Sequence, residues 1–138
     1  MDNKDISVKI AVATHKEYRM PEDEMYVPFL AGAALRDEDF GYMRDDCIED
    51  NISEKNPNFS ELTVLYEAVR VLDAEYIGLA HYRRHFAKEG FSTLENILIN
   101  KEDSRFANVL SYEELETLIP SKKIILPKKR NYRVETIF

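Results

Sequence analysis

The sequence is poor in the residues from which several common kinds of site are built. Cys47 is the only cysteine among 138 residues, which excludes a disulfide framework and a cysteine-based zinc site. Glycine occurs only four times, and no glycine-rich loop of the Walker or dinucleotide-binding type is present. Any phosphate site in this chain must therefore be built from side chains and helix N-termini.

Positive charge and long apolar runs are also scarce. The 19 Lys and Arg residues face 26 Asp and Glu residues, for a net charge of −7, which argues against nucleic acid as a partner. A local basic pocket for a nucleotide remains compatible with that charge. No apolar run approaches the roughly 20 residues that span a bilayer, and no signal peptide is visible. We expect a cytoplasmic protein, with peripheral contact at the inner face of the membrane left open.

Three stretches predict a strand–helix–strand unit. Val8–Ala13 and Tyr76–Ala80 are short apolar runs typical of buried parallel strands. Between them, Asn58 as N-cap and Glu61 three positions later indicate a helix start. Apolar residues then recur at three- and four-residue spacing, at Leu62, Leu65, Ala68, Val69 and Leu72. The unit predicts a single α/β domain over residues 1–138, with a mostly parallel sheet and flanking helices.

Two segments between the first strand and this helix are less regular. Tyr26–Leu35 is apolar and small, and its pattern does not separate strand from helix, although Pro28 disfavours a central strand. Arg36–Asn58 is rich in acidic residues and shows no clear periodicity. Its length and its lack of a Gly/Ser run favour a functional loop over a linker.

The last third of the chain predicts one helix and one strand. Lys88–Asn108 shows little periodicity and is interpreted as an insertion. Ser111 and Glu114 form a capping box that opens a short helix through Leu118. Lys123–Leu126 is predicted as a further buried strand, ended by proline and followed by the basic residues Lys128, Lys129 and Arg130.

The stretch from His81 to Phe86 carries the clearest functional signal. It follows a predicted strand directly, and the carboxyl ends of strands in an open α/β sheet are where ligands bind. Arg83 and Arg84 suit an anionic ligand there, because a guanidinium matches phosphate oxygens with a planar fork of donors. An exposed basic turn that pairs with nearby carboxylates explains the same residues equally well.

Several motifs in fixed order resemble one bacterial family. They are Thr14-His15-Lys16, Asp50–Asn56, Ser60–Thr63 with Tyr66, Tyr76–Leu79, His81–Arg84 with Phe86, and Ile125–Tyr132. The family comprises capsular, exopolysaccharide and lipopolysaccharide biosynthesis proteins, with a domain first filed as of unknown function and regarded as a glycosyltransferase of GT-A-like fold. Since the family domain is considerably longer, the resemblance implies an amino-terminal portion of an incomplete GT-A-like domain. The usual tryptophans of the family's helix are absent here.

The resemblance also implies a binding site for a nucleotide-sugar. Lys55 and Asn56 suit an anion for a further reason, because they precede a predicted helix start; pairing of Lys55 with Glu54 or Asp50 is the alternative. Glu61 and Thr63 could equally be capping residues. No catalytic base or nucleophile is assigned. The residues expected to bind the donor and its diphosphate are Thr14, His15, Lys16, Asp50, Asn51, Lys55, Asn56, Glu61, Thr63, His81, Tyr82, Arg83 and Arg84.

The role of a metal stays open at this point. Many GT-A enzymes place an Asp-x-Asp metal motif where this chain has His81-Tyr82-Arg83. We therefore expect that His81, Arg83 and Arg84 neutralise the departing diphosphate and that no cofactor is required. Mg²⁺ or Mn²⁺ remains the alternative, held by His81 and Asp50 or by the acidic residues Asp45, Asp46 and Asp50.

The implied activity is transfer of a sugar from a UDP- or GDP-sugar to a saccharide or lipid-linked saccharide acceptor. The product is a capsule, an exopolysaccharide or an O-antigen, or its lipid-linked precursor. Two alternatives stay open. One is a catalytically silent module that binds a nucleotide-sugar or acts as a scaffold. The other is a metal-dependent hydrolase that uses His15, Asp50, His81 and His85.

Overall fold

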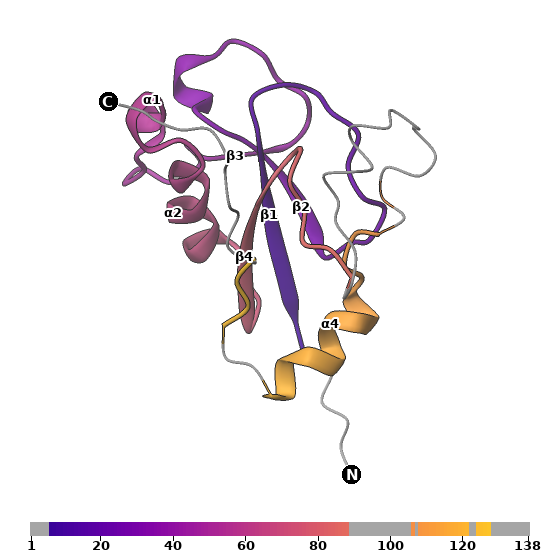
Figure 1. The fold of residues 1–138 in the computed structure, drawn as a ribbon. Helices are drawn as coiled ribbons and strands as arrows, with labels where there is room; N and C mark the ends of the chain where they lie inside the picture. Colours follow the sequence, from indigo (N-terminus) through magenta and orange to yellow (C-terminus); the bar gives the residue numbers. More distant parts are fainter. Residues whose placement is uncertain (1–5, 89–105, 107, 122–123, 128–138) are drawn as a thin grey trace, which may run out of the picture.

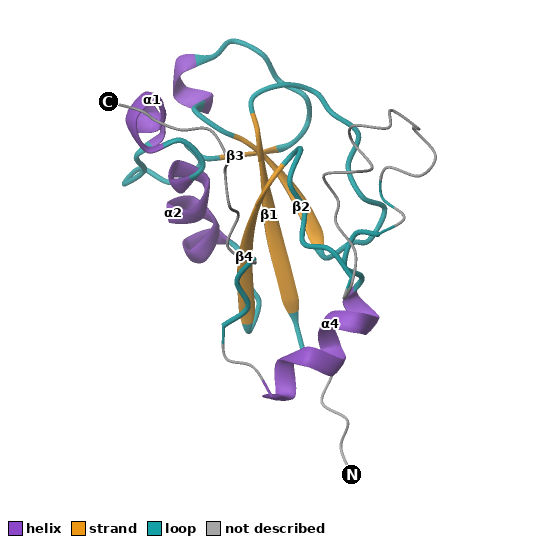
Figure 2. Ribbon diagram, in the orientation of Figure 1, coloured by secondary structure: helices purple, strands orange, loops and turns teal. Residues whose placement is uncertain are grey.

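A four-stranded parallel sheet forms the centre of the structure (Figures 1 and 2). The computed structural model describes residues 6–88, 106, 108–121 and 124–127. The sheet has the order β3-β2-β1-β4, and each neighbouring pair is parallel. This confirms the predicted α/β class and the strands predicted at Val8–Ala13 and Tyr76–Ala80. The strands are β1 (Val8–Thr14), β2 (Tyr26–Leu30), β3 (Met43–Arg44) and β4 (Tyr76–His81).

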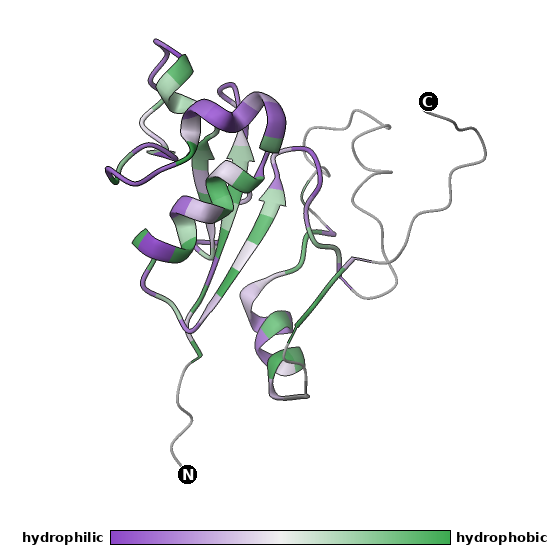
Figure 3. Cartoon of the chain, turned by 90° about the vertical axis from the view of Figure 1, so that its left-hand side faces the viewer, coloured by the Kyte–Doolittle hydropathy of each residue, from purple (hydrophilic) through white to green (hydrophobic). Residues whose placement is uncertain are grey.

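Strand β1 lies in the middle of the sheet and is buried on both faces. Every second residue from Val8 to Val12 joins a core that includes residues of α4 (Tyr112–Leu118). The small residues between and beyond them pack with α2 (Leu62–Val71) on the other face. Figure 3 shows α2 lying across the strands. A parallel strand covered on both sides needs the nearly continuous apolar sequence that β1 has.

The helix after the acidic segment begins later than predicted. Asn58 lies inside a separate four-residue helix, α1 (Asn56–Phe59), and α2 starts only at Leu62. Glu61 stands at the N-cap of α2 but makes no side-chain capping bond. The predicted capping box is therefore wrong. The reason is Ser60, whose positive φ of 49° turns the chain between the two helices.

The segment after the first loop is a strand despite its proline. Pro28 lies within β2, which is an interior strand. Hydrogen bonds from β2 to β1 use Met25 and Ala31, which are odd-numbered positions. Because hydrogen-bonding direction alternates along a strand, the backbone nitrogen of Pro28 faces the side of β2 away from β1. On that side β3 pairs only with Phe29 and Leu30, which follow Pro28. The missing N–H of the proline costs no ladder hydrogen bond.

Helix α4 is confirmed and the strand predicted after it is not. Ser111 caps α4, because its hydroxyl accepts a hydrogen bond from the backbone N–H of Glu114 at 3.3 Å. A short 3₁₀ helix, η4 (Ile119–Ser121), follows. Residues 124–127 form no strand, and Ile124 and Leu126 are exposed. They lack a ladder to β4, which is an edge of the sheet in the described part of the chain.

Several predictions fall outside the described residues. They concern Lys123, the basic run Lys128–Arg130 and most of the insertion Lys88–Asn108. In the part that is described, no helix is long and apolar enough to cross a membrane.

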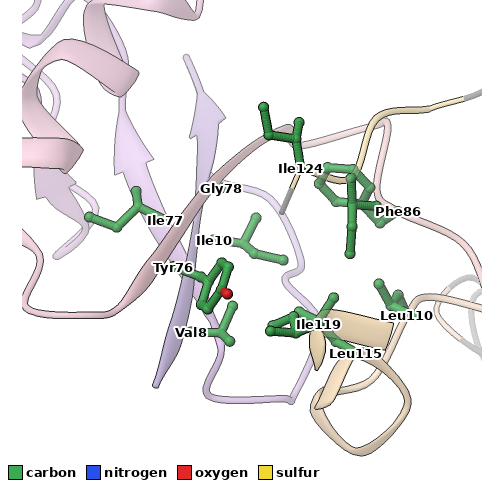
Figure 4. A pocket seen from close by; sticks show the side chains of 11 residues that line it. Val8, Ile10, Tyr76, Ile77, Gly78, Phe86, Leu110, Leu115, Ile119 and Ile124 are labelled. Carbon is green, nitrogen blue, oxygen red and sulfur yellow. The ribbon is translucent and has the colours of Figure 1, made fainter. Parts of the chain in front are cut away.

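An apolar cavity of about 190 Å³ lies between β4 and α4 (Figure 4). Ile10, Tyr76 and Gly78 of the sheet face Leu115 and Ile124 across it. None of the residues that line it is charged. The cavity therefore does not provide the ionic partners that a phosphate group needs.

A buried carboxylate fixes the acidic segment to the rest of the fold. Asp45 is fully buried and accepts four hydrogen bonds. The backbone N–H groups of Gly32 and Ala33 donate at 2.7 and 2.9 Å. The hydroxyls of Ser53 and Thr63 donate at 2.5 and 2.6 Å. These donors bring together η1 (Ala33–Leu35), η2 (Ser53–Lys55) and the start of α2.

The segment predicted as a loop is thus an ordered layer that contains β3, η2 and α1. A second buried acid supports it, since Glu67 of α2 accepts a hydrogen bond from the backbone N–H of Ile48 at 2.9 Å. Gly32 is required at its position: its φ is 64°, and an added Cβ would lie 2.9 Å from Oδ1 of Asn56.

We expect that Asp45→Asn lowers the free energy of unfolding by about 2–4 kcal/mol, because an amide nitrogen cannot accept the bonds that a carboxylate oxygen accepts. Asp46→Asn is the matched control. Asp46 is partly exposed and pairs with Arg44 at 2.9 Å, so its loss should cost less than about 1 kcal/mol. Urea denaturation measures both. Equal stabilities of the two variants would contradict the role given to Asp45.

Candidate functional site

The carboxyl edge of the sheet brings the ends of three strands together. Ala31, just after β2, donates its N–H to the carbonyl of Thr14 at 2.8 Å. Tyr82, just after β4, donates its N–H to the carbonyl of Ala13 at 3.0 Å. The residues that follow β1, β2 and β4 are therefore neighbours (Figure 1). Glu61, before α2, lies close enough to His81 to influence its pKa.

Tyr82 is the centre of this edge. It is 4% exposed. Its ring centroid lies 4.4 Å from that of His81, 5.3 Å from that of His15 and 4.9 Å from that of Tyr18. The Nζ atom of Lys16 lies 5.6 Å from the same ring, within the range of a cation–π contact. A buried aromatic ring thus places residues from the β1 and β4 loops side by side.

Three exposed cations belong to the loops that carry His15 and Tyr82. Lys16, Arg83 and Arg84 are exposed. None of the three forms an ion pair with a carboxylate of the described residues. In a chain with a net charge of −7, cations that stay unpaired are available to an anionic ligand. Within the described ranges, these residues do not form the basic turn paired with nearby acids that was the alternative interpretation.

The two histidines of this edge are held neutral. The pKa of His15 is lowered by burial and by the positive charges of Arg36 and Lys16. Burial also lowers the pKa of His81, against the opposing charge of Glu61. At neutral pH both rings are therefore uncharged hydrogen-bonding groups.

The hydrogen bonds of His81 define which of its nitrogens carries the proton. The backbone N–H of Arg83 donates to Nδ1 of His81 at 3.2 Å. Since Nδ1 accepts, the neutral ring carries its proton on Nε2. Nε2–H is then the donor that His81 offers to a ligand.

Four of the residues predicted for the donor site have side-chain hydrogen bonds within the fold. The hydroxyl of Thr14 is buried and donates to the carbonyl of Lys16 at 2.6 Å. The amide of Asn56 donates to Thr63, which itself donates to the buried Asp45 network. The amide of Asn51 donates to the carbonyl of Ile48 at 2.7 Å. These groups shape the edge and have their own partners.

Two further residues predicted for the donor site, Asp50 and Lys55, have different surroundings from these four, and Glu61 lies near His81. Asp50 pairs with Arg70 at 2.9 Å, in the last turn of α2. Lys55 is exposed and makes no ion pair with Glu54 or Asp50. The helix start predicted beside it is only the four-residue α1, whose Asn56 side chain is already bonded. The predicted helix-dipole anion site at this position is therefore not formed.

Among the described residues, no group of three or more His, Cys, Asp and Glu side chains could hold a metal ion. Asp45 is used by its four hydrogen bonds, and Asp46 pairs with Arg44. The proposed hydrolase set of His15, Asp50, His81 and His85 is likewise not assembled into one metal site.

Sequence reasoning missed Arg36, which also lies at this edge. Its Nε donates to the carbonyl of Ala31 at 3.2 Å, and its charge acts on His15. The sequence pattern that could have indicated it is an arginine shortly after an apolar segment, since Arg36 follows β2 and the short helix η1. The acidic residues that follow it conceal that signal in the sequence.

A family model described as "Domain of unknown function (DUF4422)" matches residues 9–138. The chain belongs to this family. A solved structure of the bifunctional glycosyltransferase WbbM in its apo form matches with a TM-score of 0.57 and 38% sequence identity. No curated protein matches the chain.

The match to WbbM covers 62% of this chain and 16% of that much longer chain. The DUF4422 chain thus resembles part of a glycosyltransferase, and its α/β fold agrees with the fold that the motifs implied.

His85 lies beneath the site and not in it. Its Nε2 is 3.1 Å from the carbonyl oxygen of Tyr82, and its ring packs edge-on against Tyr26 and Phe106. Burial lowers the pKa of His85 from 6.5 to about 4. The unfolded chain therefore binds a proton at a higher pH than the folded one.

We predict that this difference appears as acid sensitivity. The stability that His85 contributes is present above pH 6.5 and is lost as the pH falls from 6.5 towards 4, by about 3 kcal/mol in full. NMR titration of the ring protons gives the pKa directly. His85→Phe retains an aromatic ring and should flatten the dependence of stability on pH over that range. A measured pKa near 6.5 would contradict the burial described here.

Proposed function

We propose that this chain is the nucleotide-sugar-binding portion of a glycosyltransferase. The donor is a UDP- or GDP-sugar, and the acceptor is a growing bacterial capsule, exopolysaccharide or O-antigen, or its lipid-linked precursor. The resemblance to part of the glycosyltransferase WbbM supports the reaction class. The polysaccharide acceptor rests on the motifs of the sequence, and the whole enzyme would include more than the region matched here.

One observation carries the donor site. Lys16, in the loop after β1, lies over the buried ring of Tyr82, and the exposed Arg83 and Arg84 follow Tyr82 directly in the loop after β4. Ligands of open parallel sheets bind at this carboxyl edge. Lys16, Arg83 and Arg84 supply positive charge where a diphosphate would lie, and His81 adds a neutral N–H donor.

The chemistry follows from that arrangement. In glycosyl transfer, the bond between the anomeric carbon and the diphosphate oxygen breaks, and the acceptor hydroxyl oxygen forms the new bond. Negative charge develops on the departing diphosphate, so fixed cations stabilise the transition state more than the ground state. Arg83 and Arg84 are placed for this role at the end of β4. The position of an Asp-x-Asp motif thus holds groups that bind the anion directly.

The binding test compares two exposed arginines that make no ion pair with a described residue and one arginine that is paired with an aspartate. Arg83→Gln with Arg84→Gln removes two exposed, unpaired cations, and should weaken UDP or GDP binding by about tenfold or more in calorimetry. Arg70→Gln is the control, because Arg70 is held by Asp50 in the last turn of α2. It should bind as the wild type does.

Three further outcomes decide the proposal. Binding that persists in EDTA and gains nothing from Mn²⁺ supports a diphosphate held by side chains. Binding that is equal in the double variant and the wild type would contradict the donor site. Phosphoesterase turnover that requires Mn²⁺ would instead favour the hydrolase.

A further inference from the structure

Arg36 is an arginine whose position is fixed but whose charge has no partner. It is half-buried at the end of η1. Its Nε donates to the carbonyl of Ala31 at 3.2 Å, which fixes the plane of the guanidinium. The bond leaves the two terminal nitrogens as the remaining donors of the group.

The absence of a carboxylate partner is unexpected at this place. Asp37, Glu38 and Asp39 follow directly in the sequence, yet Arg36 makes no ion pair with any described residue. Arg44 and Arg70 show the usual arrangement, each paired with an aspartate at 2.9 Å. A guanidinium that is held by one hydrogen bond and has no counter-charge among the described residues is available to the phosphate oxygens of a ligand.

The sheet places Arg36 on the opposite side of the site from Arg83. Ala31, which accepts the bond from Arg36, is itself bonded to Thr14, and His15 follows at once. Arg83, Lys16 and Arg36 lie in the segments that follow β4, β1 and β2, and these three strands are adjacent in that order in the sheet (Figure 1). Neighbouring strands are about 4.8 Å apart, so β4 and β2, which lie on either side of β1, are separated by roughly 10 Å.

We propose that Arg36 forms a second anion-binding position, which holds a phosphate of the same ligand that Arg83 and Arg84 hold from the β4 side. The inference rests on the proposed function and extends it. The ligand class is a diphosphate ester, whose two phosphates carry separate charges along its length. The terminal nitrogens of Arg36 bind the phosphate nearer β2, and Arg83 and Arg84 bind the one nearer β4.

The test uses UDP and inorganic pyrophosphate as probes, with the wild type and three variants. Arg36→Gln removes the charge, Arg36→Lys retains it without the fork of donors, and Arg70→Gln is the matched control. Calorimetry at low salt gives the affinities, and thermal unfolding shows that each variant is folded. We expect Arg36→Gln to lose about tenfold or more in affinity for both probes. Arg36→Lys should fall between it and the wild type.

The possible outcomes distinguish a failure of the role of Arg36 from a failure of the proposed nucleotide-sugar binding. Equal affinities of Arg36→Gln and the wild type for both probes would overturn the role of Arg36, whatever the effect of Arg83→Gln. If pyrophosphate binding depends on Arg36 but UDP binds no more tightly than pyrophosphate, the anion position stands and the nucleotide site falls. A wild type that binds neither probe would overturn both.

Discussion

The buried carboxylate of Asp45 is the constraint on which the carboxyl edge depends. Its four hydrogen bonds hold the end of β2, the segment 36–58 and the start of α2 in one arrangement. Arg36 follows η1 and Glu61 precedes α2, and both of these helices are bonded to Asp45. A buried acid without a cation is stable here because donors satisfy it from several elements. The same bonds that stabilise the fold therefore hold the segments that carry Arg36 and Glu61.

Most of the fold could be predicted where local sequence and tertiary packing agree. Val8–Thr14 is apolar because both faces of β1 are covered, and Ser111 caps α4 through a purely local bond. The start of α2 could not be predicted, since the turn at Ser60 depends on Asn56 and Thr63. The position of Pro28 inside β2 could not be predicted either. A proline is tolerated there because β3 is short, and the local sequence does not indicate how long β3 is.

The candidate site was predictable in its location and not in its details. The basic pair after an apolar strand correctly indicated the carboxyl edge, because parallel strands deliver their ends to one place. The sequence did not show which polar residues hydrogen-bond within the fold. Thr63 and Asn56 were predicted to bind a ligand, but both belong to the network around Asp45. Arg36 was hidden for the opposite reason, since only the structure shows that its acidic neighbours leave it unpaired.

Mapping a bound nucleotide onto the backbone tests the central claim most directly. In a ¹⁵N-labelled sample titrated with UDP, the account predicts that the largest amide shifts fall on residues 14–16, 31–36 and 81–84, at the ends of β1, β2 and β4. Shifts concentrated instead on the residues around the apolar cavity between β4 and α4 would contradict it.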